Sequence, residues 1–418
     1  MKRLLVLLLA ACGSHPAPTS LRDACRPVAL NAELAWYGHN RVDLEAQLDS
    51  RGCASPGFDP RARPLALFDW DDTIAKNDAG DAFTAWLIAH AKVRQPPGQD
   101  WTQTSRFLTA AAAAALAAAC GTTVAAGQPL PTDVNHACAD EMWSIYLDEV
   151  TTGHQPAWMA TTPRHNKPSY AWAPQLFAGY THEEVQAFVR SMLEEQLAAP
   201  AGSTMTVGTH EVDGWLRIYD QQASLLAAAR SRGYDVWIIT ASAQDVISVF
   251  AQRVDIPADH VIGIRSIVDA AGKLTTHLEG CGPSGDGEDG IIPYLEGKRC
   301  FINKVIFGDR TAAALDRRVD RSREVLAGGD SDSDVEFLRD ATYKWVLNRN
   351  KPALMCRAYA NDHDSWRINP MFLGPKPVNR LPYPCSTTAC VDASGAKVPC
   401  LDDAGKVLPD QADTIHAR

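Results

Sequence analysis

Short apolar segments of strand length alternate along the chain with segments of helical pattern, and this alternation restricts the possible folds more than any other feature. Apolar runs of about four to eight residues are typical of strands buried on both faces of a sheet. Their alternation with helices predicts an α/β fold built on a doubly wound parallel sheet. The predicted strands are residues 64–68, 234–239, 260–264, 324–327 and 344–347.

A long segment between the first two predicted strands, residues 76–214, has a helical pattern and is expected to form an inserted helical cap domain. Residues 110–119 are alanine apart from Leu116, and alanine is the strongest helix former. The insert shows no strand-like alternation. Outside it, helices are predicted over residues 30–48 and 217–232, and residues 268–277 are expected to form a hairpin.

Polar and charged side chains occur where the predicted strands end. Because ligands of open parallel sheets bind at the carboxyl ends of the strands, these side chains are candidates for one common site. They are Asp69 and Asp71 after the first strand, Thr240 after the second, Lys298 at the start of the helix before the fourth strand, and Asp330 and Asp334 after the fourth strand. Ser242 remains an alternative to Thr240, and Lys304 remains an alternative to Lys298.

In order and context, these residues resemble the four motifs of the haloacid dehalogenase superfamily, and the resemblance covers residues 64–75 and 215–350. It implies a Rossmann-like core and a phosphoric monoester hydrolase, with Asp69 as nucleophile and Asp71 as general acid/base. It further implies that Thr240 and Lys298 bind the substrate phosphate, that Asp69, Asp330 and the backbone carbonyl of Asp71 hold Mg²⁺, and that Asp334 orients Lys298 or a metal-bound water.

The chemistry of phosphate hydrolysis requires these residue types. A carboxylate nucleophile divides the reaction into two displacements through an aspartyl-phosphate. A second carboxyl nearby can protonate the leaving alkoxide and then activate water. A divalent cation offsets the repulsion between two anions, and magnesium prefers few carboxylates and several waters. Asp71 also favours a phosphatase or phosphomutase, because dehalogenases lack this Asp. Asp72 departs from the pattern, since relatives often have Gly or Asn there.

Residues 260–265, 272–275 and 279–280 resemble the phosphoserine phosphatase-like branch. Further similarity, over residues 237–242, 329–334 and 366–371, extends to the periplasmic phosphorylcholine phosphatases. This resemblance implies a small phosphorylated substrate such as phosphorylcholine. Aromatic faces bind quaternary ammonium groups, although most aromatic residues of a helical domain pack in its core. The aromatic residues of the insert are Trp86, Trp101, Trp143, Tyr146, Trp158, Tyr170, Trp172 and Tyr180.

The N-terminus has the pattern of an export signal. Lys2 and Arg3 precede the apolar run 4–11, which ends at Cys12. The last four of these residues resemble a bacterial lipobox, in which the cysteine is lipidated. We therefore expect a lipoprotein signal peptide over residues 1–11 and an extracytoplasmic protein, on the periplasmic or outer membrane surface, anchored through Cys12. A core helix or a wrongly assigned start codon is the alternative. The apolar run is too short to span a bilayer.

The cysteine content agrees with export. The chain has eleven cysteines, and setting aside Cys12 leaves an even number, which in an exported protein favours disulfides. Sequence alone does not determine their pairing. The nearest neighbours along the chain give the first candidates, which are Cys25–Cys53, Cys120–Cys138 and Cys281–Cys300.

These patterns divide the chain into five parts. After the signal peptide come a tether with an N-terminal helical segment (12–63), the catalytic core (64–75 and 215–378), the inserted cap (76–214) and a cysteine-containing extension (379–418). The formal net charge of −10 argues against a nucleic-acid partner.

Two alternatives to a phosphatase of this kind stay open. A mutase or phosphotransferase shares all four motifs, although nucleoside triphosphate donors are scarce outside the cytoplasm. A non-catalytic scaffold that binds a headgroup or a partner is the other. Within the phosphatase interpretation, a phosphoserine phosphatase-like or broad-specificity enzyme is an alternative to one for phosphorylcholine. The sequence does not indicate an oligomeric state.

Overall fold

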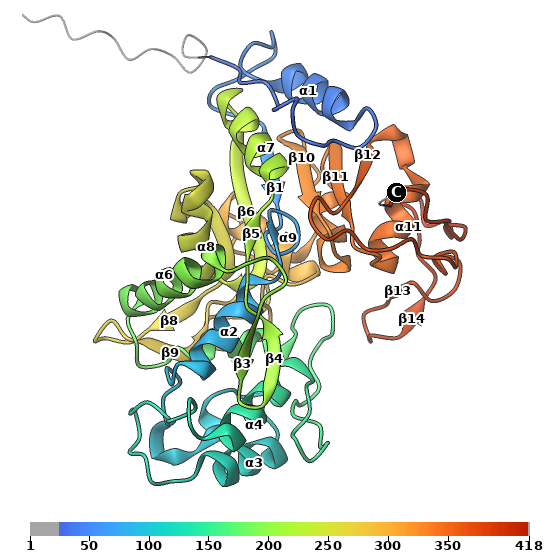
Figure 1. Cartoon of the computed structure of the whole chain (residues 1–418). Coiled ribbons are helices and arrows are strands. Elements are labelled where there is room, and N and C mark those ends of the chain that lie inside the picture. The colour runs from blue at the N-terminus through green and yellow to red at the C-terminus, as the bar shows by residue number, and fades with distance from the viewer. Residues whose placement is uncertain (1–24, 417–418) are drawn as a thin grey trace, which may run out of the picture.

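A computed structural model describes residues 25–416 of the chain. Its centre is a six-stranded sheet in the order β12-β11-β10-β1-β6-β7, in which every neighbouring pair is parallel (Figure 1). The predicted α/β fold is confirmed. The predicted signal peptide 1–11 and the predicted lipidation site Cys12 lie outside the described residues. The strands are β1 (Leu65–Phe68), β6 (Asp235–Ala243), β7 (Val261–Ile264), β10 (Glu324–Gly329), β11 (Tyr343–Asn348) and β12 (Trp366–Pro370).

The order of the strands places a crevice beside β1. The chain runs from β1 through β6 to β7 on one side of the sheet, and later from β10 through β11 to β12 on the other side. The winding direction therefore reverses between β1 and β10. In doubly wound sheets, ligands bind at the carboxyl ends of the strands at such a switch point.

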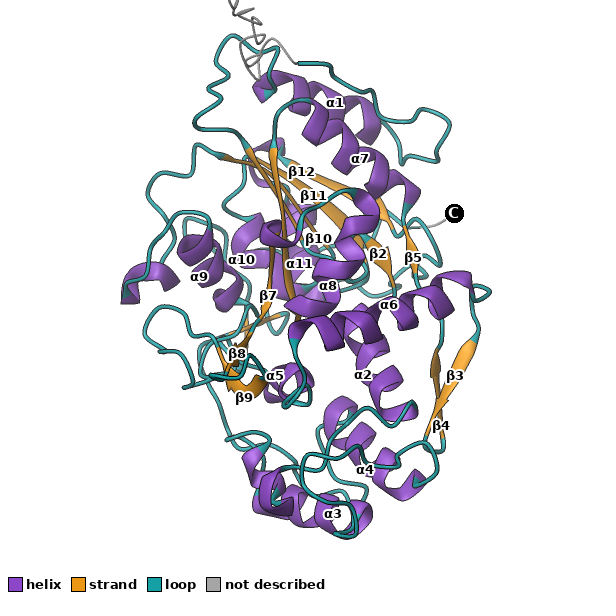
Figure 2. Cartoon of the chain, turned by 90° about the vertical axis from the view of Figure 1, so that its left-hand side faces the viewer, coloured by secondary structure: helices purple, strands orange, loops and turns teal. Residues whose placement is uncertain are grey.

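Helices cover both faces of the sheet (Figure 2). Alternate residues of a strand point to opposite faces, so Ala66 and Phe68 join one apolar core while Leu65 and Leu67 join the other. The first core includes α1 (Asn40–Arg51), α7 (Asp220–Ser231) and α8 (Gln244–Ala251), and it continues into the helices of the insert. Those of the second are α9 (Glu296–Val305), α10 (Val335–Leu338) and α11 (Pro352–Ala360).

The insert between β1 and β6 is mainly helical and lies beyond the sheet, below it in Figure 1. Its elements are α2 (Ala79–Ala89), α3 (Ala110–Cys120), α4 (His136–Leu147), α5 (Pro168–Gln175), α6 (His182–Ala198) and the antiparallel pair β3 (Thr204–Val207) and β4 (His210–Asp213). The short strands β2 (Ala75–Lys76) and β5 (Arg217–Ile218) pair at its two ends. The insert was expected to lack strands, and the β3–β4 hairpin corrects this expectation.

Two predicted helices begin later than expected. The helix predicted from residue 30 starts at Asn40, because Gly38 adopts a left-handed φ of 52° just before it. The helix predicted from residue 217 starts at Asp220, because residues 217–218 pair with β2 instead. The predicted hairpin after β7 is confirmed as β8 (Ser266–Val268) and β9 (Leu274–Leu278).

Five disulfides join all ten cysteines of the described residues. The three predicted pairs, Cys25–Cys53, Cys120–Cys138 and Cys281–Cys300, are present. The other two pairs, Cys356–Cys385 and Cys390–Cys400, hold the C-terminal extension and its hairpin of β13 (Cys390–Val391) and β14 (Lys397–Val398).

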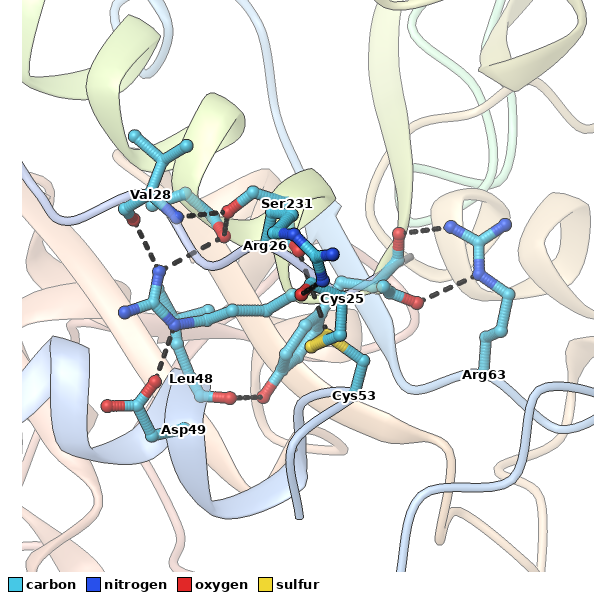
Figure 3. Close-up of a disulfide and its surroundings, with 12 residues drawn as sticks. Cys25, Arg26, Val28, Leu48, Asp49, Cys53, Arg63 and Ser231 are labelled. Atoms are coloured by element: carbon cyan, nitrogen blue, oxygen red, sulfur yellow. Dashed lines mark hydrogen bonds and ion pairs between the residues drawn. A yellow bond between two sulfur atoms is a disulfide. The ribbon is translucent and has the colours of Figure 1, made fainter. Parts of the chain in front are cut away.

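The first disulfide, Cys25–Cys53, closes a loop around α1 within the N-terminal segment (Figure 3). Beside it, Arg232 donates to Asp49 Oδ1 at 2.6 Å and also to the carbonyl oxygen of Val28. Among the described residues, no helix combines the length and the apolar character needed to cross a bilayer.

Candidate active site

The ends of two neighbouring strands bring the predicted acidic residues together. Asp69 directly follows β1, and Asp330 directly follows β10, so both lie at the switch point of the sheet. Asp334 stands in the turn after β10. One carboxylate oxygen from each of these three buried residues lies within 4.8 Å of the others.

Lys298 bridges two of these carboxylates. It comes from the first turn of α9 and donates to Asp69 Oδ1 at 2.7 Å and to Asp334 Oδ1 at 2.6 Å. Burial alone would lower the pKa of Lys298, but the charges of Asp334 and Asp69 outweigh it and raise this pKa above its usual value. The alternative, Lys304, lies elsewhere, because it donates to the carbonyl oxygen of Gly280 at 2.7 Å.

Asp334 is held rigidly behind the site. Its Oδ2 accepts from the backbone N–H groups of Asp330 at 3.1 Å and of Ser331 at 3.0 Å. Gly329 leaves room for this contact, since a Cβ at that position would lie 2.7 Å from the Asp334 Cβ. Both carboxylate oxygens of Asp334 thus accept hydrogen bonds from protein donors. This agrees with its predicted role in orienting Lys298.

The carboxylate of Asp71 points to a different part of the site. Its Oδ1 accepts from the backbone N–H of Ala79 at 2.8 Å, and its Oδ2 accepts from Ser242 Oγ at 2.7 Å and from Thr240 Oγ1 at 3.3 Å. Burial raises the pKa of Asp71 to about 6, although the hydrogen bonds from Ser242 and Ala79 act to lower it. A carboxyl with a pKa near neutrality can both give and take a proton.

The two candidate hydroxyl groups differ in access. Ser242 lines the cavity described below, whereas Thr240 is fully buried and lies outside its lining. Thr240 Oγ1 accepts from the backbone N–H of Ser242 at 3.0 Å. The prediction that Thr240 binds phosphate stays a prediction. Ser242, its alternative, has the hydroxyl at the cavity wall.

Asp330 has two protein partners, neither of which was predicted. Thr73 Oγ1 donates to its Oδ1 at 2.8 Å, and Arg349 Nη1 donates to its Oδ2 at 2.8 Å. Burial raises the pKa of Asp330 to about 6, against the lowering effect of Arg349. The only available signal for Arg349 is its position directly after β11, at the same edge of the sheet as the predicted residues.

Asp72, the departure from the family pattern, is explained by its backbone and by Arg349. Its φ of 56° lies in the left-handed region, which Gly and Asn tolerate better than other residues. Its side chain is buried and forms an ion pair with Arg349 Nη2 at 3.1 Å. It also accepts from the backbone N–H of Asn77 at 3.1 Å.

The donor set suits a hard divalent cation. Carboxylate oxygens are the ligands that Mg²⁺ prefers, and the mutual repulsion of buried carboxylates favours a cation between them. Burial, followed by the nearby charge of Asp334, raises the pKa of Asp69 well above its usual value. Asp69 Oδ2 accepts no hydrogen bond from the described residues, and Asp69 lines the cavity. Asp69 and Asp330, which follow neighbouring strands and have carboxylate oxygens within 4.8 Å of each other, are the side chains that could hold the ion. Asp330 would do so beside its contacts with Thr73 and Arg349.

A cavity of about 300 Å³ opens above these residues, between the sheet and the insert. Lys298 and Arg349 line it on the sheet side. The insert supplies Asp78 and Asp81 from the start of α2. Three tyrosines also line it, namely Tyr146 from α4, Tyr170 from α5 and Tyr294 from the loop before α9.

The acidic pair on α2 faces the cavity with unused oxygens. Asp78 Oδ1 caps the helix by accepting from the backbone N–H of Asp81, and Asp81 Oδ1 accepts from Tyr146 Oη at 2.7 Å. Neither Oδ2 accepts a hydrogen bond from the described residues. Burial, followed by the charge of Asp71, raises the pKa of Asp78 well above its usual value. Of the eight aromatic residues proposed for a cage, Tyr146 and Tyr170 line this cavity and the other six do not.

Arg164 fastens the insert to the rest of the chain beside this cavity. Its Nε donates to Glu296 at 2.7 Å and its Nη2 donates to Glu336 at 2.6 Å, so it joins the insert to α9 and α10. Its Nη1 also donates to the carbonyl oxygen of Val391 in the C-terminal extension, at 3.0 Å. The insert, the core and the extension therefore meet at one guanidinium group.

One known family matches part of this chain. Residues 137–339, just under half of the chain, match the family described as haloacid dehalogenase-like hydrolase. The matched stretch includes Lys298, Asp330 and Asp334 and begins after Asp71. No curated protein matches the sequence significantly.

Solved structures resemble the chain at low sequence identity. A functionally unknown protein from Anaerococcus prevotii has 19% identity over 82% of this chain and 94% of that one, with a TM-score of 0.57. This likeness shows the fold. A protein of unknown function from Bordetella pertussis has 16% identity over 74% and 99% of the two chains, with a TM-score of 0.44. A substrate-bound phosphoserine phosphatase has 13% identity over 68% and 86%, with a TM-score of 0.30.

Proposed function

We propose that this protein is a magnesium-dependent phosphatase that hydrolyses small phosphomonoesters through an aspartyl-phosphate on Asp69. The observation that carries the proposal is the convergence of Asp69, Asp71 and Lys298 on the wall of one cavity at the switch point of the sheet. The match of residues 137–339 to the haloacid dehalogenase-like hydrolase family agrees with it.

The first displacement uses Asp69 and Asp71. A carboxylate oxygen of Asp69 attacks phosphorus, the bond from phosphorus to the ester oxygen breaks, and the leaving oxygen takes a proton from Asp71. The pKa of Asp71, raised to about 6 by burial, keeps part of this carboxyl protonated near neutral pH. Lys298, already 2.7 Å from Asp69 Oδ1, offsets the negative charge that gathers on the phosphoryl oxygens.

The second displacement reverses the proton transfer. Asp71, now a carboxylate, takes a proton from water as the water oxygen attacks phosphorus. The bond from phosphorus to the Asp69 oxygen breaks, which restores the free carboxylate and releases inorganic phosphate. As the family resemblance implies, Asp69, Asp330 and the backbone carbonyl of Asp71 would hold Mg²⁺, and the bound ion would supply the charge compensation that lets an anion approach an anion.

We further propose that the leaving alcohol carries a positive charge, as in phosphorylcholine. Asp78 and Asp81 supply negative charge to the insert side of the cavity, and Tyr146, Tyr170 and Tyr294 supply aromatic rings. Cations bind over aromatic faces, and Lys167 Nζ already lies 4.3 Å from the centre of the Tyr170 ring. A phosphoserine phosphatase-like or broad-specificity enzyme is the second candidate, because the ammonium group of phosphoserine fits the same carboxylates.

The location outside the cytoplasm and the lipid anchor on Cys12 are also proposals. Five disulfides among the described residues favour an oxidising compartment. Mass spectrometry of the membrane fraction tests the anchor, because lipidation adds acyl mass to a peptide that begins at Cys12. An unmodified Cys12 in a soluble chain would contradict it.

The activity is tested by phosphate release from phosphorylcholine, phosphoserine and p-nitrophenyl phosphate, each with Mg²⁺ and with chelator. We expect Mg²⁺-dependent turnover that Asp69→Asn abolishes. Asp332→Asn is the matched control, because Asp332 also lines the cavity but accepts from the backbone N–H of Leu354 instead of facing Lys298. Absence of turnover on every ester by folded, oxidised protein would refute the phosphatase and favour a binding scaffold.

The charge of the alcohol is tested with Asp81→Asn. We expect the KM for phosphorylcholine to rise about tenfold, because one unit of negative charge is lost beside a buried cation. The KM for p-nitrophenyl phosphate, whose alcohol is neutral, should stay within about twofold of the wild-type value under the same reasoning. An equal change in KM for both esters would refute the proposal of a cationic alcohol but would not affect the proposal of a phosphatase.

A further inference from the structure

Arg349 stands between two carboxylates at the edge of the sheet. Its Nη1 donates to Asp330 Oδ2 at 2.8 Å, and its Nη2 lies 3.1 Å from Asp72 Oδ2. The side chain of Arg349 is 27% exposed and lines the cavity, whereas Asp330 is fully buried. The guanidinium group is therefore at the boundary between the acidic cluster and the solvent of the cavity.

The two cations of the site divide the carboxylates between them. Lys298 contacts Asp69 and Asp334, whereas Arg349 contacts Asp330 and Asp72. Asp72 also forms an ion pair with Lys76 at 3.3 Å. A divalent cation that binds Asp69 and Asp330 would share Asp330 with Arg349. Two cations on one carboxylate repel each other, and this repulsion is strong where burial lowers the effective dielectric constant.

We propose that Arg349 is a positioning residue that holds Asp330 in place through the Asp72–Arg349–Asp330 bridge and weakens the binding of the divalent cation. The inference rests on the proposed metal site and adds a residue that sets its affinity. It also gives Asp72 a role, since Asp72 draws part of the guanidinium charge away from Asp330.

The proposal fixes the direction of two affinity changes. Arg349→Met removes the competing positive charge, so Mg²⁺ should bind about tenfold more tightly. In Asp72→Asn, Asp330 is the one remaining carboxylate paired with the guanidinium group, and one negative charge is lost. Mg²⁺ should therefore bind more weakly. The double variant should lie between the two single variants, because its two changes act in opposite directions.

Isothermal titration of the full chain with MgCl₂, without substrate, measures these affinities. Lys351→Met is the matched control, because Lys351 lines the same cavity but forms no ion pair with Asp330 or Asp72 among the described contacts. Its Mg²⁺ affinity should change by less than about twofold, since its charge is not shared with a ligand carboxylate. Should Arg349→Met unfold without metal, Arg349→Gln replaces it, with circular dichroism confirming the fold.

The outcomes separate this inference from the phosphatase. Tighter Mg²⁺ binding in Arg349→Met, with Lys351→Met unchanged, supports it. The inference is overturned if Arg349→Met binds Mg²⁺ no more tightly than the wild type, or if Lys351→Met tightens Mg²⁺ binding by the same amount. This holds even if phosphate release is intact. If Mg²⁺ affinity shifts as expected in the variants but no ester is hydrolysed, the phosphatase proposal is refuted and the role of Arg349 stands. Wild-type protein that binds no Mg²⁺ would overturn both.

Discussion

The hydroxyl of Ser242 donates to Asp71 Oδ2 at 2.7 Å. This contact depends on Gly80, because a Cβ at that position would lie 2.5 Å from Ser242 Oγ. The start of α2 thus approaches the end of β6 closely enough for Asp71 to be held from both sides, by Ser242 and by the backbone N–H of Ala79. Besides burial, the hydrogen bonds from Ser242 and Ala79 therefore help to set the pKa of Asp71.

Ser242→Ala is expected to move the pH profile of the reaction. The hydrogen bond lowers the pKa of Asp71, which burial raises to about 6, so its loss should raise that pKa by about one unit. Because Asp71 must be protonated to release the alcohol, kcat/KM falls as pH rises through this pKa. The falling limb should therefore shift to higher pH in the variant. Ser333→Ala, in the same cavity but without contact to Asp71, is the control, and equal profiles for both would contradict the assignment.

Lys298→Met is expected to destabilise the fold strongly. Lys298 is only 1% exposed, and its loss leaves Asp69 and Asp334 buried without a counter-charge. Breaking a buried ion pair in this way costs about 3–5 kcal/mol. Urea unfolding in chelator measures the loss, and the double variant Lys298→Met/Asp334→Asn should recover part of it. No recovery would mean that packing of the lysine stem, and not its charge, stabilises the site.

Magnesium is expected to raise the thermal stability of the protein. A ligand that binds the folded state alone stabilises it by about 1.4 kcal/mol at ten times its dissociation constant. The increase in Tm on adding MgCl₂ should vanish in Asp330→Asn, because that variant loses a proposed ligand. An equal increase in this variant and in the wild type would place the ion elsewhere.

Glu296→Gln is expected to remove a pH-dependent part of the stability. A hydrogen bond from His165, together with Arg164, lowers the pKa of Glu296 to about 2 from an ordinary 4.5. A lowered pKa stabilises the fold above pH 4.5, and this stabilisation is lost as pH falls towards 2. Because Glu296 is about one-third exposed, the advantage of the wild type near pH 6 should be at most about 1 kcal/mol. Urea unfolding at several pH values should show the two proteins converging below pH 3, and a difference that grows there would refute the assignment.

The Cys356–Cys385 disulfide is expected to hold the extension on the core. Its cysteines are 29 residues apart, and a closed loop of that size accounts for about 3–4 kcal/mol in the chain-entropy model. The double variant with Ala at both positions should lose this stability and should exchange the amide hydrogens around Tyr383 faster. Unchanged exchange there would show that apolar packing alone holds the extension.

The sheet and most of the site could be predicted because both depend on local patterns. Buried strands are continuous apolar runs, and acidic residues after Phe68 and Gly329 are visible in the sequence. Strand β12 and the β3–β4 hairpin were not predicted. β12 contains Arg367 and ends in Pro370, and the hairpin is mostly exposed, so neither shows the alternation or apolar run that marks a strand.

The residues missed at the site are those whose role depends on distant partners. In the sequence, Arg349 is an ordinary basic residue. Its place in the site becomes visible only through its ion pair with Asp72, which lies 277 positions away in the chain. Tyr294 likewise reaches the cavity from a loop before α9. A contact between residues so far apart in the sequence cannot be predicted from a local pattern. By contrast, three disulfides between cysteines that are near neighbours along the chain were predicted correctly.

The Arg164 contacts have a consequence for what the protein can meet in its surroundings. Opening the insert like a lid would break two ion pairs and a bond to the extension at once. A cavity of about 300 Å³ that keeps its walls has room for about ten water molecules. Under the proposed function we therefore expect selection by size: a phosphorylated protein or an intact phospholipid would stay outside, and its small headgroup would become a substrate only after another enzyme had cut it free.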